Sequence, residues 1–298
     1  MLGRLGKDAG SLLGVEIAAD SVRMLQLQGR QGAEHVRAWA YQPLPGAVGN
    51  DWAQAPDTLI DALRCAFERC GSRRAQVAVA LPGGATLCKL CCLPAGLSVA
   101  QLEQRLLVDA EQMFPFALED LALDFQVLGP AVEPVGHVNV LVAACRQRSL
   151  DQLEQLLEAA GLCAVAVEVD SIALRRLVPD GQALLRIEQG GAALHSWSAS
   201  GLPQRQELTF GAHEPDDARL QRVLELCAAA LPGEHSVQVV AASEQASRWL
   251  VALAAQLSCD ALSPLHGLGT AGLSNRAELA RVAPHMALAC ALALGGVC

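Results

Sequence analysis

The sequence predicts a two-lobed α/β protein in which each lobe opens with three successive strands. Short apolar runs separated by turn residues occur in a group of three near the N-terminus and again after residue 180. Helical and strand patterns alternate after each group, which favours an α/β architecture. The 298 residues suffice for two cores, and 52% hydrophobic residues with only 3% aromatics indicate packing by Ala, Leu and Val rather than disorder.

The first lobe is expected to begin with strands over residues 12–18, 22–28 and 35–41, where apolar runs lie between turn signals. A helix is predicted over residues 57–70, and Gly71 after it supplies the left-handed residue that ends many helices. An apolar run after this glycine predicts a fourth strand.

The next segment predicts a β-α-β unit. A strand over residues 87–93 stops at a Pro-Ala-Gly turn, and Ser98 with Gln101 forms a capping box that begins a helix. Residues 114–116 end that helix, because the proline among them disfavours helical geometry in the residue before it. Residues 121–128 then alternate as a half-buried strand.

A second capping box, Ser149 with Gln152, is expected to begin the following helix. Strands are predicted on either side of it, over residues 138–144 and 164–169. Asp170, or the serine after it, is expected to cap a short helix.

The second lobe is predicted to start after Pro179-Asp180-Gly181, three residues typical of turns. Its expected strands cover residues 183–187, 193–198, 206–210 and 237–241, and its expected helices cover residues 215–231 and 243–257. A duplicated three-strand opening of this kind is found in the superfamily of actin, the sugar kinases and Hsp70.

Charge and hydropathy exclude several classes. Twenty-two basic against 31 acidic residues give a net charge of −9, which argues against nonspecific nucleic-acid binding. We expect no membrane span, because the longest apolar candidate, residues 286–298, is short and contains glycines. The first ten residues lack a signal-peptide core, so we expect a cytosolic chain.

The 11 cysteines are expected to be thiols, as is usual for a cytosolic chain. Most, including Cys65, Cys145 and Cys163, lie in apolar patterns and are expected to act as small hydrophobic residues. Cys88 and Cys91 have C-x-x-C spacing, but residues three apart on a strand face opposite ways. We therefore expect no metal site.

Several motifs occur in a fixed order: LLGVEIAADSVRMLQL near the N-terminus, LPAGLS from Leu93, AEQ from Ala110 and DFQVLG from Asp124. This set resembles the PilM family, actin-like cytoplasmic components of type IV pilus assembly machines. The resemblance covers roughly residues 11–177. It implies an actin-like fold with a first lobe over residues 1–180, a second over residues 181–298, and an inserted α/β subdomain over about residues 85–166.

In the actin superfamily, ATP lies between the lobes, held by strand-turn-strand loops whose backbone N–H groups approach the phosphates. The resemblance assigns Glu16 and Ser21 to the first loop and Asp170 to an acid in the connecting segment. The second loop departs from the pattern. Arg186 replaces the acid that organises Mg²⁺, and Glu188 replaces a glycine and would oppose phosphate.

Two further positions also differ from the superfamily. Arg23 stands where the family usually has Lys, and Ala241-Ala242 corresponds to the glycine pair near the adenosine. We therefore expect no catalytic residues, no ATP turnover and at most weak binding of ATP with Mg²⁺.

The resemblance also implies a partner. Members of the family bind the cytoplasmic N-terminal segment of the membrane protein PilN in a groove between the first lobe and the insertion. Phe114, Pro115, Phe116 and Phe125 are candidates to line that groove; the alternative is that they are core residues of the insertion.

Three functions follow from these patterns. The leading hypothesis is an adaptor at the inner face of the cytoplasmic membrane in a type IV pilus system. The alternatives are an active ATPase or small-molecule kinase with the same fold, and the cytoplasmic part of a type II secretion platform protein.

Overall fold

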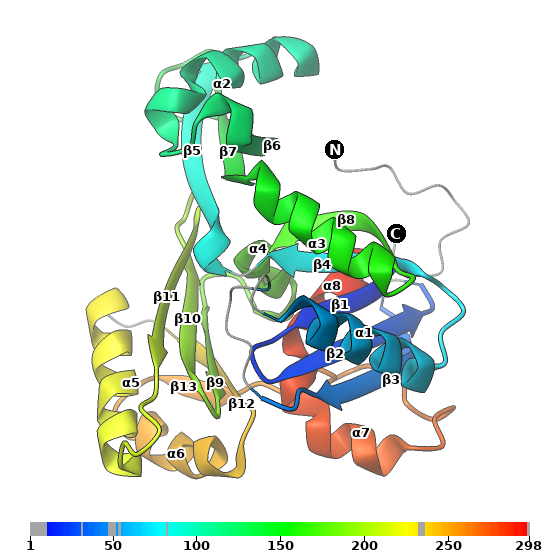
Figure 1. Ribbon diagram of the computed structural model, residues 1–298. Coiled ribbons are helices and arrows are strands. Elements are labelled where there is room, and N and C mark those ends of the chain that lie inside the picture. The colour runs from blue at the N-terminus through cyan, green and yellow to red at the C-terminus, as the bar shows by residue number, and fades with distance from the viewer. Residues whose placement is uncertain are drawn as a thin grey trace.

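The computed structural model describes residues 11–30, 32–46, 52, 55–81, 83–231 and 236–296. The first ten residues, on which the expectation about a signal peptide rests, lie outside this set. Within the described residues, the strands form two five-stranded sheets and one three-stranded sheet. Figure 1 shows the two large sheets in the lower half of the molecule and the small sheet projecting at the top.

The strands are β1 (Leu13–Ile17), β2 (Ser21–Gln28), β3 (His35–Pro43), β4 (Gln76–Leu81), β5 (Thr86–Pro94), β6 (Leu121–Pro130), β7 (His137–Arg146), β8 (Cys163–Val169), β9 (Ala183–Glu188), β10 (Gly191–Trp197), β11 (Pro203–Thr209), β12 (Val237–Ala241) and β13 (Cys259–Ala261). The α-helices are α1 (Pro56–Cys70), α2 (Val99–Met113), α3 (Gln147–Ala159), α4 (Asp170–Leu174), α5 (Asp216–Ala230), α6 (Glu244–Ala254), α7 (Arg276–Val282) and α8 (Ala287–Gly295). Short 3-10 turns are η2 (Gly83–Ala85), η3 (Leu118–Asp120), η4 (Arg175–Leu177) and η5 (Ala283–Met286).

The two large sheets share one topology, which confirms the predicted duplication. The first has the order β3-β2-β1-β4-β8 and the second β11-β10-β9-β12-β13. In each, three antiparallel strands come first, and two parallel strands extend the sheet on the other side. Parallel pairs need a covering crossover, and α1 and α3 supply it in the first sheet while α5 and α6 cover the second.

The small sheet has the order β5-β7-β6, and α2 packs on it around Leu102, Leu106 and Phe114. Strands β5 and β6 both run antiparallel to β7, so β5-α2-β6 is the predicted β-α-β unit with β7 between its strands. Strand β8, which begins inside the expected insertion of about residues 85–166 and continues beyond it, pairs with β4 in the first large sheet. The lobe and insertion boundaries stay predictions.

One predicted capping box is confirmed and the other is wrong. Ser98 and Gln101 exchange both hydrogen bonds at the start of α2. By contrast, α3 begins at Gln147, before Ser149, and has no side-chain cap of its own. The carboxylate of Asp120 instead accepts a hydrogen bond from the backbone N–H of Arg148 (3.2 Å). A residue distant in sequence therefore satisfies one of the N–H groups that the first turn of α3 leaves without a partner in the helix.

The short helix α4 also begins differently from the prediction. Val169 occupies the position before its first turn, and Asp170 is already helical. The carboxylate of Asp170 accepts a hydrogen bond from the N–H of Ser171 (2.6 Å). The predicted cap is therefore wrong by one position, because the helix starts directly at the end of β8.

The C-terminal helix α8 lies between the two large sheets. Ala287 and Ala291 belong to one buried cluster with Ala78 of the first sheet and Leu184 of the second. By length and composition alone, the helical run Arg276–Gly295 is apolar enough to span a membrane, since its most apolar 18-residue window has a mean hydropathy of 1.3. The expectation that no segment reaches that limit is wrong because α7, η5 and α8 form one run; 56% of its most apolar stretch is buried inside this fold.

Candidate functional site

Two β-hairpins, β1–β2 of the first lobe and β9–β10 of the second, meet between the lobes through charged side chains. Glu16 and Arg23 are directly paired across β1 and β2. Arg186 and Glu188 are two residues apart on β9 and therefore project from the same face. These four side chains form a cluster that we call the interlobe ion network.

Arg23 and Glu188 make the central contact of this network. Nη1 and Nη2 of Arg23 donate to the two carboxylate oxygens of Glu188 at 2.8 and 2.9 Å, the fork geometry that favours arginine over lysine. Arg186 Nη2 donates to Glu16 at 2.7 Å and to Glu188 at 2.8 Å. Two cations and two anions from both lobes thus neutralise one another.

The rest of the first hairpin supports Arg23. Ser21 Oγ accepts a hydrogen bond from Arg23 Nε at 2.9 Å and donates to Asp20 at 2.7 Å. Arg23 Nη2 also reaches Asp20 at 3.0 Å, and Nη1 donates to the backbone carbonyl of His285 at 3.1 Å. Every nitrogen of this guanidinium therefore has a partner.

Burial makes these charges depend on one another. The side chain of Arg23 is fully buried, while that of Glu188 is 26% exposed. Burial disfavours the ionised form of Glu188, but the charge and hydrogen bonds of Arg23, helped by Arg186, outweigh it and hold its pKa below the ordinary value. Burial likewise opposes the charge of Arg23, and Glu188 and Glu16 raise its pKa well above the ordinary value.

Asp170 lies in a separate polar cluster that also joins the lobes. Nε of Arg205, on β11, lies 3.2 Å from Oδ2 of Asp170. Nη2 of the same arginine lies 2.6 Å from Oε2 of Glu207. Burial raises the pKa of Asp170 despite the opposing charge of Arg205. Beside it, the hydroxyl of Ser171 lies 2.8 Å from Nδ1 of His195. Burial lowers the pKa of His195 well below its ordinary value, so this imidazole is neutral.

The predicted nucleotide residues are therefore placed in two groups. Glu16 and Ser21 both contact the interlobe ion network, whereas Asp170 belongs to the Arg205 cluster. The turn N–H of Ala18 donates to the Ser21 carbonyl, and the N–H of Ala242 donates to the Ile187 carbonyl. Both N–H groups therefore already donate hydrogen bonds to backbone carbonyls of the protein.

Sequence reasoning missed the pairing of Arg23 with Glu188. The signal was present: the first hairpin carries Glu16 and Arg23, and the second carries Arg186 and Glu188, which are opposite charges at related positions of a duplicated fold. Considered alone, the negative charge of Glu188 would repel a phosphate group. Considered together, the two arginines and the two glutamates balance one another's charge.

A second concave feature lies between the small sheet and the first large sheet. It is a cavity of about 390 Å³ between β6, β7, α3 and β8, lined among others by Asp124, Ala143, Glu154 and Ala166. We call it the insertion groove. Strand β8 is the edge strand of the first sheet, so one side of its backbone is not paired with another described strand. The groove therefore combines an open strand edge with apolar walls.

The four residues expected to line a partner groove lie outside the insertion groove. Phe114 is buried, and Phe116 and Phe125 are half-buried against the core of the insertion. Pro115 is exposed. None of the four is among the lining residues of the insertion groove. Along β6, Asp124 lines the groove while Phe125 packs against the insertion core, as strand alternation requires.

The described cysteines are free thiols. Cys145, Cys227 and Cys290 are buried, as expected of small hydrophobic residues, whereas Cys65 and Cys163 are exposed and do not act in that way. Burial raises the pKa of Cys290 to about 12. No group of three or more His, Cys, Asp or Glu residues suited to a metal ion occurs in the described part of the chain.

Comparison with known proteins places this fold. The family model described as type IV pilus assembly protein PilM matches residues 14–188. A solved PilM-PilN type IV pilus biogenesis complex has a chain with 21% identity and a TM-score of 0.75, covering 96% of this chain and 98% of that one. Its overall fold is therefore similar to the present one along nearly the whole length.

Two other solved structures are more distant. The cytoplasmic domain of EpsL, an inner-membrane component of the type II secretion system of Vibrio cholerae, has 16% identity and a TM-score of 0.48, covering 78% of this chain and 82% of that one. The ethanolamine utilization protein EutJ of Carboxydothermus hydrogenoformans has 11% identity and a TM-score of 0.49, covering 98% and 91%.

The duplicated sheets have the topology predicted for an actin-like fold, and the family match extends from the β1–β2 hairpin to the end of β9. Both ends of the interlobe ion network, Glu16 and Glu188, fall inside that matched region. The chain has the two-lobed actin-like fold and belongs to the PilM family of type IV pilus assembly proteins.

Proposed function

We propose that this protein is a cytoplasmic adaptor of a type IV pilus assembly platform and that it binds the cytoplasmic N-terminal segment of a PilN-like membrane protein. Family membership supports the pilus role. The similar solved structure is a PilM-PilN complex, which supports a PilN-like partner. The adaptor would lie at the inner face of the cytoplasmic membrane, held there by its partner.

The insertion groove carries this proposal. An extended peptide gains affinity by adding to an exposed strand edge and by placing apolar side chains in adjacent pockets. Strand β8 offers the edge, and Ala143 and Ala166 give the groove small apolar side chains that leave room for those of a peptide. In this proposal, residues 86–146 act as the outer wall of the partner site.

The interlobe ion network supports a role without nucleotide turnover. A phosphate entering between the hairpins would meet Glu16 and Glu188 and would have to separate them from Arg23 and Arg186. Removing one partner from a buried ion pair costs about 3–5 kcal/mol. We therefore propose that the ion network holds the lobes together and that this chain is not an ATPase.

The test is binding of a synthetic peptide with the sequence of the N-terminal cytoplasmic segment of the PilN-like protein from the same organism. Ala143 lines the groove and is half-buried, so Ala143→Phe fills the site while adding only apolar volume. The matched control is Ala117→Phe, at an exposed alanine of the insertion that does not line the groove. Calorimetric titration is expected to show at least about a tenfold loss of affinity for Ala143→Phe and no change for the control.

A third variant tests the aromatic residues that the sequence proposed for the partner groove. Phe116→Ala removes an aromatic ring from the insertion core, so circular dichroism must first show that it folds. We expect the folded variant to bind the peptide as the wild type does. Normal binding by Ala143→Phe together with lost binding by folded Phe116→Ala would reject the insertion groove in favour of the aromatic residues.

A further inference from the structure

An arginine-lined cavity lies on the first lobe at the edge of the sheet opposite the interlobe ion network. Its volume is about 780 Å³, and its walls come from β2, β3 and the loop between α1 and β4. Gln26 in this cavity pairs with Leu13 at the start of β1, whereas Arg23 pairs with Glu16 toward the end of that strand. The arginine cavity is therefore a different site from the interlobe ion network.

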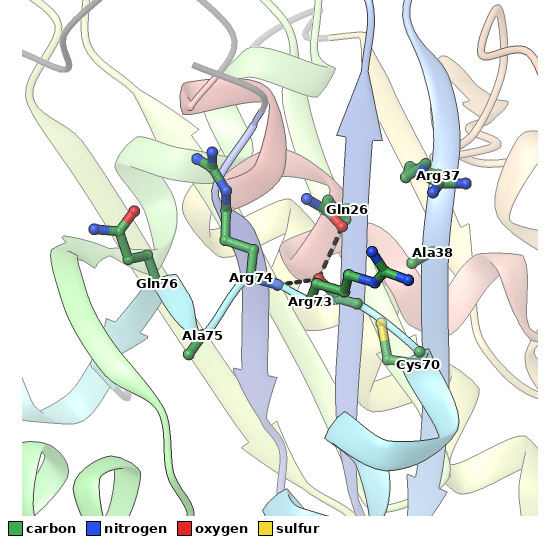
Figure 2. Close-up of a pocket in the computed structure, with 10 residues that line it drawn as sticks. Gln26, Arg37, Ala38, Cys70, Arg73, Arg74, Ala75 and Gln76 are labelled. Carbon is green, nitrogen blue, oxygen red and sulfur yellow. Dashed lines mark hydrogen bonds between the residues drawn. The ribbon is translucent and has the colours of Figure 1, made fainter. Parts of the chain in front are cut away.

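Three arginines, Arg37, Arg73 and Arg74, are among the residues that line the arginine cavity (Figure 2). Arg37 lies at an irregularity of the β2–β3 ladder, where Gln26 pairs with Ala38 and the next residue of β2 pairs with Val36. Such a bulge redirects the side chain of the extra residue. Arg73 and Arg74 come from the loop after α1. Two unrelated local features thus bring arginines to one cavity.

The floor of the cavity is held in place by hydrogen bonds. Gly71, with φ of 66°, ends α1 in the left-handed conformation and turns the chain into the loop. Ser72 Oγ donates to Oε1 of Gln26 at 2.9 Å and accepts from the N–H of Arg74 at 3.1 Å. This orientation leaves the Nε2 amide of Gln26 as a further donor, and no described residue accepts a hydrogen bond from it.

The charge of the cavity is unusual for this chain. The protein carries a net charge of −9, yet no carboxylate among the described residues forms an ion pair with Arg37 or Arg73. Arginines after a helix can complement the negative end of its dipole, which accounts for Arg73 and Arg74. Arg37 comes from a strand, and its position at the same cavity is not explained by that dipole.

We propose that the arginine cavity binds a soluble ligand that carries two or more phosphoryl groups. Guanidinium forks match phosphate oxygens in charge and geometry. The volume falls within the range of about 300–1,000 Å³ that small-molecule sites occupy. Apolar lining is limited to Ala38, Cys70 and Ala75, which gives a peptide few anchors, and a recessed site does not match the flat surface of a bilayer.

The probe is sodium tripolyphosphate, titrated calorimetrically into the full chain at low ionic strength. Wild type is expected to bind it saturably and more tightly than inorganic phosphate. Arg37→Gln with Arg73→Gln removes two exposed charges and leaves shorter, neutral polar side chains, and we expect at least about a tenfold loss of affinity because each lost bond is charge-assisted. Arg248→Gln is the matched control: Arg248 is an exposed arginine of α6 without an ion pair among the described residues, and its replacement should change nothing.

Three outcomes would overturn the proposal. They are no saturable binding to wild type, equal binding to the double variant, and an equal loss in the Arg248→Gln control, which would indicate nonspecific attraction.

A sedimentation experiment distinguishes a soluble phosphate ligand from a lipid headgroup, using vesicles with and without phosphatidylglycerol. Vesicle binding that tripolyphosphate does not compete would assign the arginines to a membrane surface instead, and unchanged melting temperatures of the unliganded variants show that the comparison concerns folded protein.

Discussion

Arg23 is completely buried, and its charge is compensated by carboxylates from both lobes. A buried ion pair adds little net stability compared with an apolar pair, but breaking it is costly because one charge stays behind. The pairing of Arg23 with Glu188 therefore acts mainly to specify how the lobes meet. Glu16 and Arg186 extend the same contact.

Glu188→Gln tests this residue-scale account. The variant keeps the shape of the side chain but removes the main counter-charge of Arg23, so we expect the free energy of unfolding to fall by about 3 kcal/mol. Urea denaturation measures it, with Glu158→Gln on the exposed face of α3 as the control, for which a change within about 0.5 kcal/mol is expected. Equal stability of the two variants would show that the ion network does not hold the lobes.

The same residue predicts a pH dependence. The pKa of Glu188 in the folded protein is below its ordinary value, so its stabilising contribution is complete above the unfolded pKa of about 4.3 and is lost as the pH falls toward the folded pKa. Wild type should therefore lose more free energy of unfolding than Glu188→Gln between about pH 6 and pH 3. Parallel pH profiles would contradict this assignment.

At the scale of elements, helix starts show what local sequence determines. The capping box of α2 involves Ser98 and Gln101, three residues apart. The start of α3 depends on Asp120, 28 residues before Arg148 in the sequence. The start of α2 was therefore predictable from a few neighbouring residues, whereas the start of α3 was not.

Two serine variants separate these cases. Ser98→Ala removes a side-chain acceptor from the first turn of α2, and we expect a loss of about 1 kcal/mol in the free energy of unfolding. Ser149→Ala lies inside α3, where no cap is lost, and should cost less than half as much. Chemical denaturation of both variants provides the comparison. A larger loss for Ser149→Ala would restore the second capping box.

Packing of α8 on β1 makes another element-scale prediction. A Cβ at Gly14 would lie 2.1 Å from the backbone oxygen of Ala289 and 2.8 Å from the nitrogen of Ala293. Gly14→Ala must displace the helix, and we expect a loss of about 2–3 kcal/mol in the free energy of unfolding. At Gly84 an added Cβ meets no described atom within 4 Å, so Gly84→Ala should unfold at nearly the wild-type temperature. Similar melting of both variants would contradict the close packing.

At the scale of the whole molecule, the duplicated fold was predictable because each three-strand opening repeats a local pattern of apolar runs and turns. The path of the C-terminal segment was not predictable from the sequence. Residues 287–293 of α8 are apolar on all sides and fully or nearly fully buried, so hydrophobic periodicity could not distinguish helix from strand there. The four charges of the interlobe ion network were visible in the sequence, but the pairing of Arg23 with Glu188 did not follow from any local pattern, since these residues are 165 positions apart.

The molecule thus separates two surfaces that one fold offers for function. Between the lobes, Glu16, Arg23, Arg186 and Glu188 are bonded to one another. Between the first lobe and the insertion, β8 presents an edge beside a cavity. We propose that a peptide occupies the second surface while the first serves as a fixed contact between the lobes.

Hydrogen–deuterium exchange of the full chain, with the PilN-like peptide and separately with Mg-ATP, tests this claim most directly. Backbone amides of β8 should exchange more slowly with the peptide bound, since an added strand accepts hydrogen bonds from that edge. Mg-ATP should leave exchange in the β1–β2 and β9–β10 turns unchanged. Protection of those turns by Mg-ATP, with no protection of β8 by the peptide, would contradict the account and favour a nucleotide-driven machine.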